Sequence, residues 1–268
     1  MYNLFGLRIF EKGEDLMNKL FVFDLDDTLI DNVHDYSEPI MGMARIIISE
    51  LGSRAPHVSS IIAIEDELDL RRKSEINPLT GEPFGYSRDR FPGTLVETYR
   101  FICKKVGAKP VTAVETKLYF EGNKAFDPSQ YARNIKPRAG EVLNFLRSMG
   151  NVVMICTAGD LLVQNYKLSA LRSRGISFHV ARVVDKKTPD VFRELAGNTS
   201  GYKLYSVGNN YKSDIEPALE VGYSGVYIPA ETWETIGKMD KIKETINKDR
   251  CLELASLSDL MERYEALV

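Results

Sequence analysis

Short apolar runs that end in small or polar residues recur along the chain and predict buried β-strands. These runs cover residues 20–25, 152–156, 178–184, 204–207 and 225–228. The segments between the later runs have helical spacing, and several of them end in glycine, as helices often do. Strands that alternate with helices indicate a parallel sheet covered on both faces. We therefore predict an α/β core built as a doubly wound parallel sheet.

More than 100 residues separate the first predicted strand from the second, and their apolar positions follow helical spacing. Three stripes predict a small helical bundle: Ile40, Ala44, Ile47 and Ile48; Ile61, Ile64, Glu65 and Leu68; Leu95, Tyr99, Ile102 and Val106. Residues 74–93 are rich in proline and glycine and predict a long loop. The expected organisation is a core of residues 1–31 and 137–268 with an inserted α-helical domain at 32–136.

The two ends of the chain give weaker patterns. The segment MNKLFVFDLDD would place the first strand directly after an initiator methionine at Met17, so we interpret residues 1–16 as an N-terminal extension. The tail from residue 231 to 268 has helical stripes and is expected to cover the edge of the sheet. Trp233 in this tail is expected in packing or at an interface.

Composition narrows the class of protein. With 44% hydrophobic and 27% charged residues, the chain can bury a core without disulfides. Its 35 basic and 38 acidic side chains leave a net charge of -3, which gives no general attraction to nucleic acid or anionic lipid. Cys103, Cys156 and Cys251 lack metal-ligand spacing. No apolar run approaches the roughly 18 residues of a membrane span. We expect a cytoplasmic protein with no nucleic-acid or membrane partner.

Two carboxylates follow the first predicted strand. Asp24 and Asp26 end the run FVFDLDD, and an extended chain points residues two apart toward the same face, with about 6 to 7 Å between their Cα atoms. Open parallel sheets bind ligands at the carboxyl edge, which is where these residues are expected. The sequence thus predicts a small, strongly acidic site at that edge.

The segment DLDDT resembles the first motif, Asp-x-Asp-x-Thr, of the haloacid dehalogenase superfamily, most of whose members are magnesium-dependent phosphohydrolases. Three later segments resemble the other motifs in the same order. They are VVMICTAG with Thr157, VVDKKTPDVF with Lys187, and SVGNNYKSD with Asn209 and Asp214. The resemblance spans residues 20–229 apart from the insertion.

Two positions leave alternatives open. Lys186 competes with Lys187 for the third motif, and we favour Lys187 because it directly precedes Thr188. Many relatives have aspartate where this chain has Asn209, and asparagine supplies an oxygen but no charge. We therefore interpret Asn209 as a direct or indirect ligand of the metal. Thr28 is expected to bond local backbone.

The resemblance implies a role for each motif residue. Asp24 would be the nucleophile and would also bind Mg²⁺, together with the backbone carbonyl of Asp26 and the side chain of Asp214. Hard oxygen ligands of this kind suit magnesium. Thr157 would hydrogen-bond a phosphoryl oxygen, while Lys187 would compensate negative charge in the transition state.

Asp26 separates the phosphatase branch from the dehalogenases. By resemblance, this residue protonates the leaving oxygen and later removes a proton from the attacking water. Dehalogenases displace halide, which needs no proton, and their motif lacks a carboxylate at this position. We therefore expect magnesium-dependent hydrolysis of a small phosphorylated metabolite through an aspartyl phosphate. A phosphoryl-transfer mutase and a non-catalytic regulatory protein are the alternatives, and dehalogenation is disfavoured.

In this superfamily, an insertion between the first two motifs forms a mobile helical cap that closes over the substrate and excludes water. Arg88 and Arg90 are candidates for meeting an anionic leaving group, although exposed loops commonly carry arginine without such a role. The backbone at Ala158 and Gly159, where the next helix is expected to begin, is a candidate anion contact. Oligomeric state is left open between monomer and homodimer.

Overall fold

The computed structural model describes residues 18–197, 199–232 and 235–267. The predictions for residues 1–16, Met17 and Trp233 lie outside this described part. The chain divides into two compact units. The first contains the described residues up to Asp31, then Ala132–Ala158, and then those from Asn165 onward; the second contains Asn32–Tyr131 and Gly159–Gln164.

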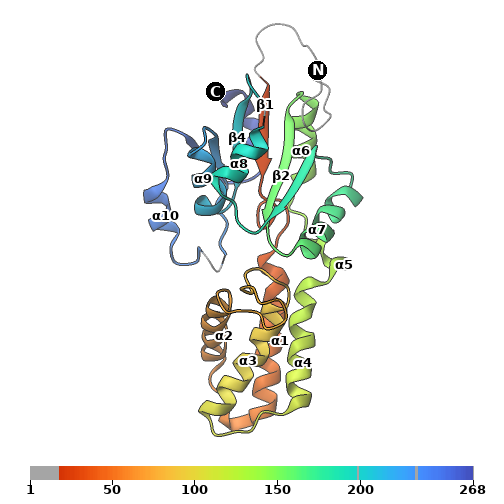
Figure 1. Cartoon of the computed structure of the whole chain (residues 1–268), viewed down its shortest axis with the longest axis vertical. Helices are drawn as coiled ribbons and strands as arrows, with labels where there is room; N and C mark the ends of the chain where they lie inside the picture. Colours follow the sequence, from red (N-terminus) through yellow and green to blue (C-terminus); the bar gives the residue numbers. More distant parts are fainter. Residues whose placement is uncertain (1–17, 198, 233–234, 268) are drawn as a thin grey trace. The chain divides into compact units, whose positions relative to one another are not determined.

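The first unit is built on a six-stranded sheet in which every neighbouring pair is parallel, with the strand order β3-β2-β1-β4-β5-β6. Figure 1 labels its central strands, with β1 between β2 and β4. The strands are β1 Lys19–Phe23, β2 Val152–Ala158, β3 Val180–Val184, β4 Lys203–Gly208, β5 Ser224–Tyr227 and β6 Cys251–Glu253. The helices that follow the insertion are α6 Ala139–Ser148, α7 Leu161–Ser173, α8 Pro189–Ala196, α9 Glu216–Leu219, α10 Met239–Thr245 and α11 Asp259–Glu262. The predicted doubly wound α/β fold is confirmed.

The first strand shows why the apolar runs are continuous. All five residues of β1 are buried, because helices cover both faces of the sheet. Phe21 and Phe23 pack in the hydrophobic cluster that includes α6, whereas Leu20 and Val22 pack in the cluster that includes α8. Alternate side chains of one strand therefore belong to two different cores.

The tail beyond residue 231 differs in part from its prediction. Cys251–Glu253 forms β6, which pairs in parallel with β5 and makes the sheet one strand wider than the apolar runs indicate. Three residues are too few to give a recognisable strand pattern. Leu254, Leu257 and Leu260, which the sequence assigns to a helical stripe, are buried in the same cluster as α6.

The second unit is helical. Its helices are α1 Val33–Leu51, α2 Val58–Arg72, α3 Arg90–Lys105, α4 Thr112–Asn123 and α5 Pro128–Tyr131. Most positions of the three stripes are buried or partly buried, but Ile48 is exposed and α4 follows no stripe identified in the sequence. The loop predicted at 74–93 ends earlier, because α3 begins at Arg90. A Cβ on Gly122 of α4 would lie 2.6 Å from Pro92 Cα, so glycine lets α3 and α4 approach closely.

The segments of the first unit that flank the insertion pair with each other. Ile30 forms an antiparallel bridge with Ile135, and the Asp31 amide donates to the Asn134 carbonyl over 2.8 Å. The chain thus leaves and re-enters the first unit at one point. No helix in the described ranges is long and apolar enough to cross a membrane.

Candidate active site

Strand order brings three of the sequence motifs to one edge of the sheet. β1 lies between β2 and β4, and Asp24 directly follows β1, where its amide donates to the Val207 carbonyl of β4 over 2.8 Å. Thr157 is near the end of β2, and Asn209 directly follows β4. Because parallel strands end at the same edge, these residues gather where such sheets bind ligands.

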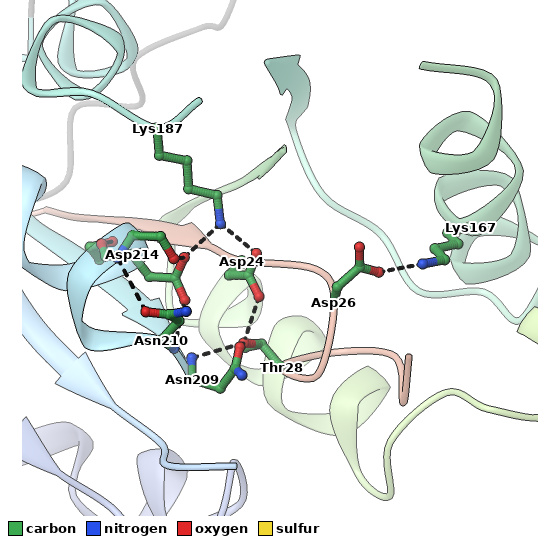
Figure 2. Close-up of polar contacts among 10 residues, drawn as sticks. Asp24, Asp26, Thr28, Lys167, Lys187, Asn209, Asn210 and Asp214 are labelled. Carbon is green, nitrogen blue, oxygen red and sulfur yellow. Dashed lines mark hydrogen bonds and ion pairs between the residues drawn. The ribbon is translucent and has the colours of Figure 1, made fainter. Parts of the chain in front are cut away.

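Lys187 bridges two buried carboxylates at this edge (Figure 2). Its ammonium donates to Asp24 Oδ1 and, over 2.8 Å, to Asp214 Oδ1. Burial is almost complete, with 8% or less of each of the three side chains exposed. Lys186, the alternative for the third motif, is exposed.

The electrostatics of this cluster follow from burial. Burial raises the pKa of the Asp24 carboxyl; Lys187 opposes this, and the carboxylates of Asp214 and Asp26 add to it, so that the pKa reaches about 7. Burial alone would lower the pKa of Lys187, but Asp214 and Asp24 more than offset it and raise the pKa. One ammonium between two carboxylates leaves a formal negative charge, which suits a further cation.

Asp214 is fixed by its own turn, which has the π-helical pattern at Tyr211–Ile215. The Asn210 amide donates to Asp214 Oδ2 over 2.9 Å, and the Ser213 hydroxyl donates to Oδ1 over 2.9 Å. The Ser206 hydroxyl of β4 donates to the Asp214 carbonyl over 2.6 Å. Backbone and side chain of Asp214 are therefore both held against the end of β4.

Gly208, the last residue of β4, leaves the space that Asp214 occupies. A Cβ at this position would lie 2.6 Å from Asp214 Cγ, far inside van der Waals contact. Gly208→Ala is expected to push the Asp214 carboxylate out of place and to lower the free energy of unfolding, measured in urea, by about 1–3 kcal/mol.

Gly140→Ala in α6 is the matched control, because the nearest atom to its Cβ would be the flexible Ile176 Cγ1 at 3.1 Å. This control should not lower the free energy of unfolding below that of the wild type. An unchanged free energy of unfolding in Gly208→Ala would mean that Asp214 does not depend on this glycine.

Thr28 and Asn209 link the first and last motifs. The Thr28 hydroxyl donates to Asp24 Oδ2 over 2.8 Å and accepts from the Asn209 backbone amide over 3.1 Å. In the orientation that satisfies its neighbours, the Asn209 side-chain nitrogen donates to Thr28 Oγ1 and to the Asp26 carbonyl, each over 3.0 Å. Thr28 therefore bonds the Asp24 side chain rather than local backbone, and Asn209 acts here as a donor.

Asp26 has a separate partner that the sequence motifs do not include. Lys167 of α7 lies 2.6 Å from Asp26 Oδ1, and Figure 2 shows the Asp26 carboxylate reaching toward that helix and the Asp24 carboxylate facing Lys187. Asp27 follows with a positive φ of 60°, which turns the chain immediately after the motif carboxylates. The sequence predicts that the carboxylates of Asp24 and Asp26 converge, whereas in the structure each is paired with a different lysine.

The remaining candidates lie as follows. Thr157 is buried, and Ala158 ends β2. Gly159 has a φ of 157°, and a Cβ there would lie 3.1 Å from Gln164 Cδ. In the second unit Arg88 is exposed, whereas Arg90 forms an ion pair with Asp69 over 3.1 Å. The charge of Arg90 is therefore already balanced.

The donor atoms around Asp24 are of the kind that magnesium prefers. Among the described residues, no group of three or more His, Cys, Asp or Glu side chains is arranged to hold a metal. Magnesium, however, is commonly bound by one or two carboxylates and keeps several waters. The Asp24 and Asp214 carboxylates with the Asp26 carbonyl fit that requirement.

No protein-family model and no curated protein sequence matches the chain. Several solved structures, however, match the chain. A haloacid dehalogenase-like family hydrolase from Xanthomonas campestris matches with a TM-score of 0.63 at 20% identity, over 94% of this chain and 96% of that one. YfnB from Bacillus subtilis, described as a HAD-hydrolase and bound to magnesium, has a TM-score of 0.55 at 14% identity, over 93% and 100%.

A dehalogenase is also similar. The L-2-haloacid dehalogenase from Xanthobacter autotrophicus has a TM-score of 0.51 at 18% identity, over 94% of this chain and 100% of that one. The chain therefore has the fold of the haloacid dehalogenase-like hydrolases, as its motifs predict. A fold of this kind hosts more than one reaction, so the activity has to be argued from the site itself.

Proposed function

We propose that this protein is a magnesium-dependent phosphatase that hydrolyses a small phosphate monoester through an aspartyl phosphate on Asp24. One observation carries the proposal. The Asp24 carboxylate is buried between Lys187 and Asp214, while a second carboxylate, Asp26, is held apart by Lys167. A nucleophile and a proton-transfer group need these two different environments.

In the first half of the reaction, an Asp24 oxygen forms a bond to phosphorus and the bond from phosphorus to the ester oxygen breaks. Asp26 donates a proton to that departing oxygen, so the alcohol leaves neutral. Lys187 offsets the charge on the phosphoryl oxygens, and the Thr157 hydroxyl donates a hydrogen bond to one of them.

In the second half, Asp26 accepts a proton from a water molecule while the water oxygen bonds to phosphorus. The bond to Asp24 then breaks and inorganic phosphate is released. Asp24, the Asp26 carbonyl and Asp214 would hold Mg²⁺, which supplies charge neutralisation for the phosphate dianion. Asn209 would keep Asp24 and the Asp26 carbonyl in place through its side-chain amide.

Two other reactions use related chemistry. Dehalogenation is disfavoured although the Xanthobacter enzyme shares the fold, because halide leaves without a proton and Asp26 would have no task. A mutase would pass the phosphoryl group from Asp24 to a second hydroxyl instead of water. Release of free phosphate separates hydrolysis from that alternative.

The second unit would act as the cap that selects the substrate. An exposed arginine, Arg88, would meet an anionic group on the leaving alcohol, whereas Arg90 is already paired with Asp69. The proposed substrate is accordingly a small phosphorylated metabolite.

The proposal is tested by measuring phosphate release with magnesium or with a chelator from sugar phosphates, nucleotides, phosphoglycolate and an aryl phosphate. Turnover is expected only with magnesium. Because protons compete with the metal for Asp24, whose pKa burial raises to about 7, the magnesium concentration for half-maximal rate should fall as pH rises from 6 to 8.

The raised pKa of Asp24 also affects the stability of the folded protein. Since the pKa of Asp24 in the folded, metal-free protein is raised above its ordinary 3.8, its contribution to stability is full below about pH 4 and is lost as pH rises through 7. Magnesium should therefore raise the melting temperature more at pH 8 than at pH 6. Halide release from a 2-haloacid, without phosphate release from any ester, would contradict the proposed function.

A further inference from the structure

Lys167 is a buried lysine that the superfamily motifs do not account for. Its side chain is 3% exposed and its ammonium lies 2.6 Å from Asp26 Oδ1, while 22% of the Asp26 side chain is exposed. The two residues are 141 positions apart in the sequence. A buried ammonium is costly unless it is paired, and the Asp26 carboxylate provides the opposite charge. The local helix structure of α7 does not explain this long-range contact.

The position of Lys167 on α7 is one where an apolar residue is expected. Val163, Lys167 and Leu171 are spaced four residues apart, which places them on one face of the helix. All three are buried. Lys167 therefore interrupts an apolar stripe, and its side chain ends at the carboxylate of the DLDDT motif.

The contact lies on the side toward which the Asp26 carboxylate points (Figure 2). In an extended chain, Asp24 and Asp26 would present their carboxylates to one face, where both could approach the same cation. Lys167 instead holds the Asp26 carboxylate toward α7, and Lys187 holds that of Asp24 toward Asp214 (Figure 2). The two lysines thereby keep the two carboxylates in separate places.

We propose that Lys167 is a positioning residue for the phosphatase reaction: it holds the Asp26 carboxylate where it can exchange a proton with the leaving oxygen, and out of the magnesium site. This inference rests on the proposed function. Lys167 itself contacts neither phosphorus nor the leaving oxygen, and it acts only through Asp26.

The test compares Lys167→Met and Lys167→Arg with Asp26→Asn on 4-nitrophenyl phosphate and on an alkyl phosphate. General acid catalysis matters most for the poor alkyl leaving group and contributes roughly 100-fold or more. Lys167→Met is expected to lower kcat for the alkyl ester by about 100-fold, to change the aryl ester far less, and to leave KM unchanged. Lys167→Arg should recover part of the loss.

Combining Lys167→Met with Asp26→Asn should be no worse than Asp26→Asn alone, because both changes remove the same function. Lys19→Met is the matched control. Lys19 is also a buried lysine, but its ammonium donates to the Tyr264 carbonyl over 3.2 Å at the start of β1. The Lys19→Met variant is expected to lower the free energy of unfolding without making the change in kcat depend on the leaving group.

Any of the following results would overturn the proposal. They are equal losses for both esters, a raised KM with normal kcat, additive losses in the double variant, and a crystal structure of Lys167→Met in which Asp26 keeps its position. The last readout needs no activity. If the wild-type protein releases phosphate from no ester, the proposed function fails; if it is active and Lys167→Met matches it, only the positioning role fails.

Discussion

Replacing Asp24 with asparagine is expected to abolish phosphate release, lowering kcat by roughly 10,000-fold or more, because the amide cannot form the bond to phosphorus. The fold should persist. Asp24 is a buried carboxylate whose pKa burial raises, so a neutral side chain of the same shape suits the metal-free interior. Thr28 and Lys187 retain partners in Asn209 and Asp214 respectively.

The measurement is phosphate release from the best substrate of the panel, with folding followed by circular dichroism. Asp27→Asn is the matched control from the same motif, because Asp27 has a φ of 60° and asparagine tolerates that conformation. It should retain most of the activity. If Asp24→Asn turned over at the rate of the wild type, Asp24 could not be the nucleophile.

The fold could be predicted from the sequence because its strands are buried on both faces. The β1 segment KLFVF is buried along its whole length and reads as one continuous apolar run. β6 has the sequence CLE, in which Cys251 is buried and Glu253 is exposed. Its place in the sheet depends on pairing with β5 rather than on its own pattern, so no local rule could identify it.

The site could be predicted where its residues end strands. Asp24 and Asn209 directly follow buried runs, and parallel strands bring such positions together. The choice between Lys186 and Lys187 could not be settled this way, because adjacent residues point in different directions and both carry the same charge. Only the structure shows that Lys187 is the buried one, in contact with Asp24.

The contact between Lys167 and Asp26 could not be predicted from the sequence, for a different reason. A lysine on a helix is usually solvated, and its partner Asp26 lies 141 positions away. The apolar residues four positions on either side, Val163 and Leu171, are the signal that marks it as buried. The orientation of the Asn209 amide is likewise set by Thr28 and the Asp26 carbonyl, which only the fold brings near.

Replacing Lys187 with methionine is expected to have the second largest effect, on both activity and stability. Without the ammonium, kcat should fall about 100- to 1,000-fold, as when one preorganised electrostatic group is removed from an active site. The buried carboxylates of Asp24 and Asp214 would also face each other without compensation. Removing one partner of a buried ion pair costs about 3–5 kcal/mol in the free energy of unfolding.

That destabilisation should depend on pH and on magnesium. Loss of Lys187 removes the group that lowers the pKa of Asp24, so the folded protein binds a proton there still more tightly than the unfolded chain does. The metal-free variant should therefore be closest to the wild type at low pH and fall further behind as pH rises through neutrality. Magnesium should recover part of the difference by neutralising the same carboxylates.

Urea unfolding at pH 5 and pH 8, with and without magnesium, measures these effects. Lys186→Met is the matched control, because it removes the same charge one residue away from an exposed side chain, and it should change the free energy of unfolding by less than about 0.5 kcal/mol. Equal stability losses in the two variants, or a Lys187→Met variant that turns over like the wild type, would show that the ammonium between Asp24 and Asp214 does not serve the reaction.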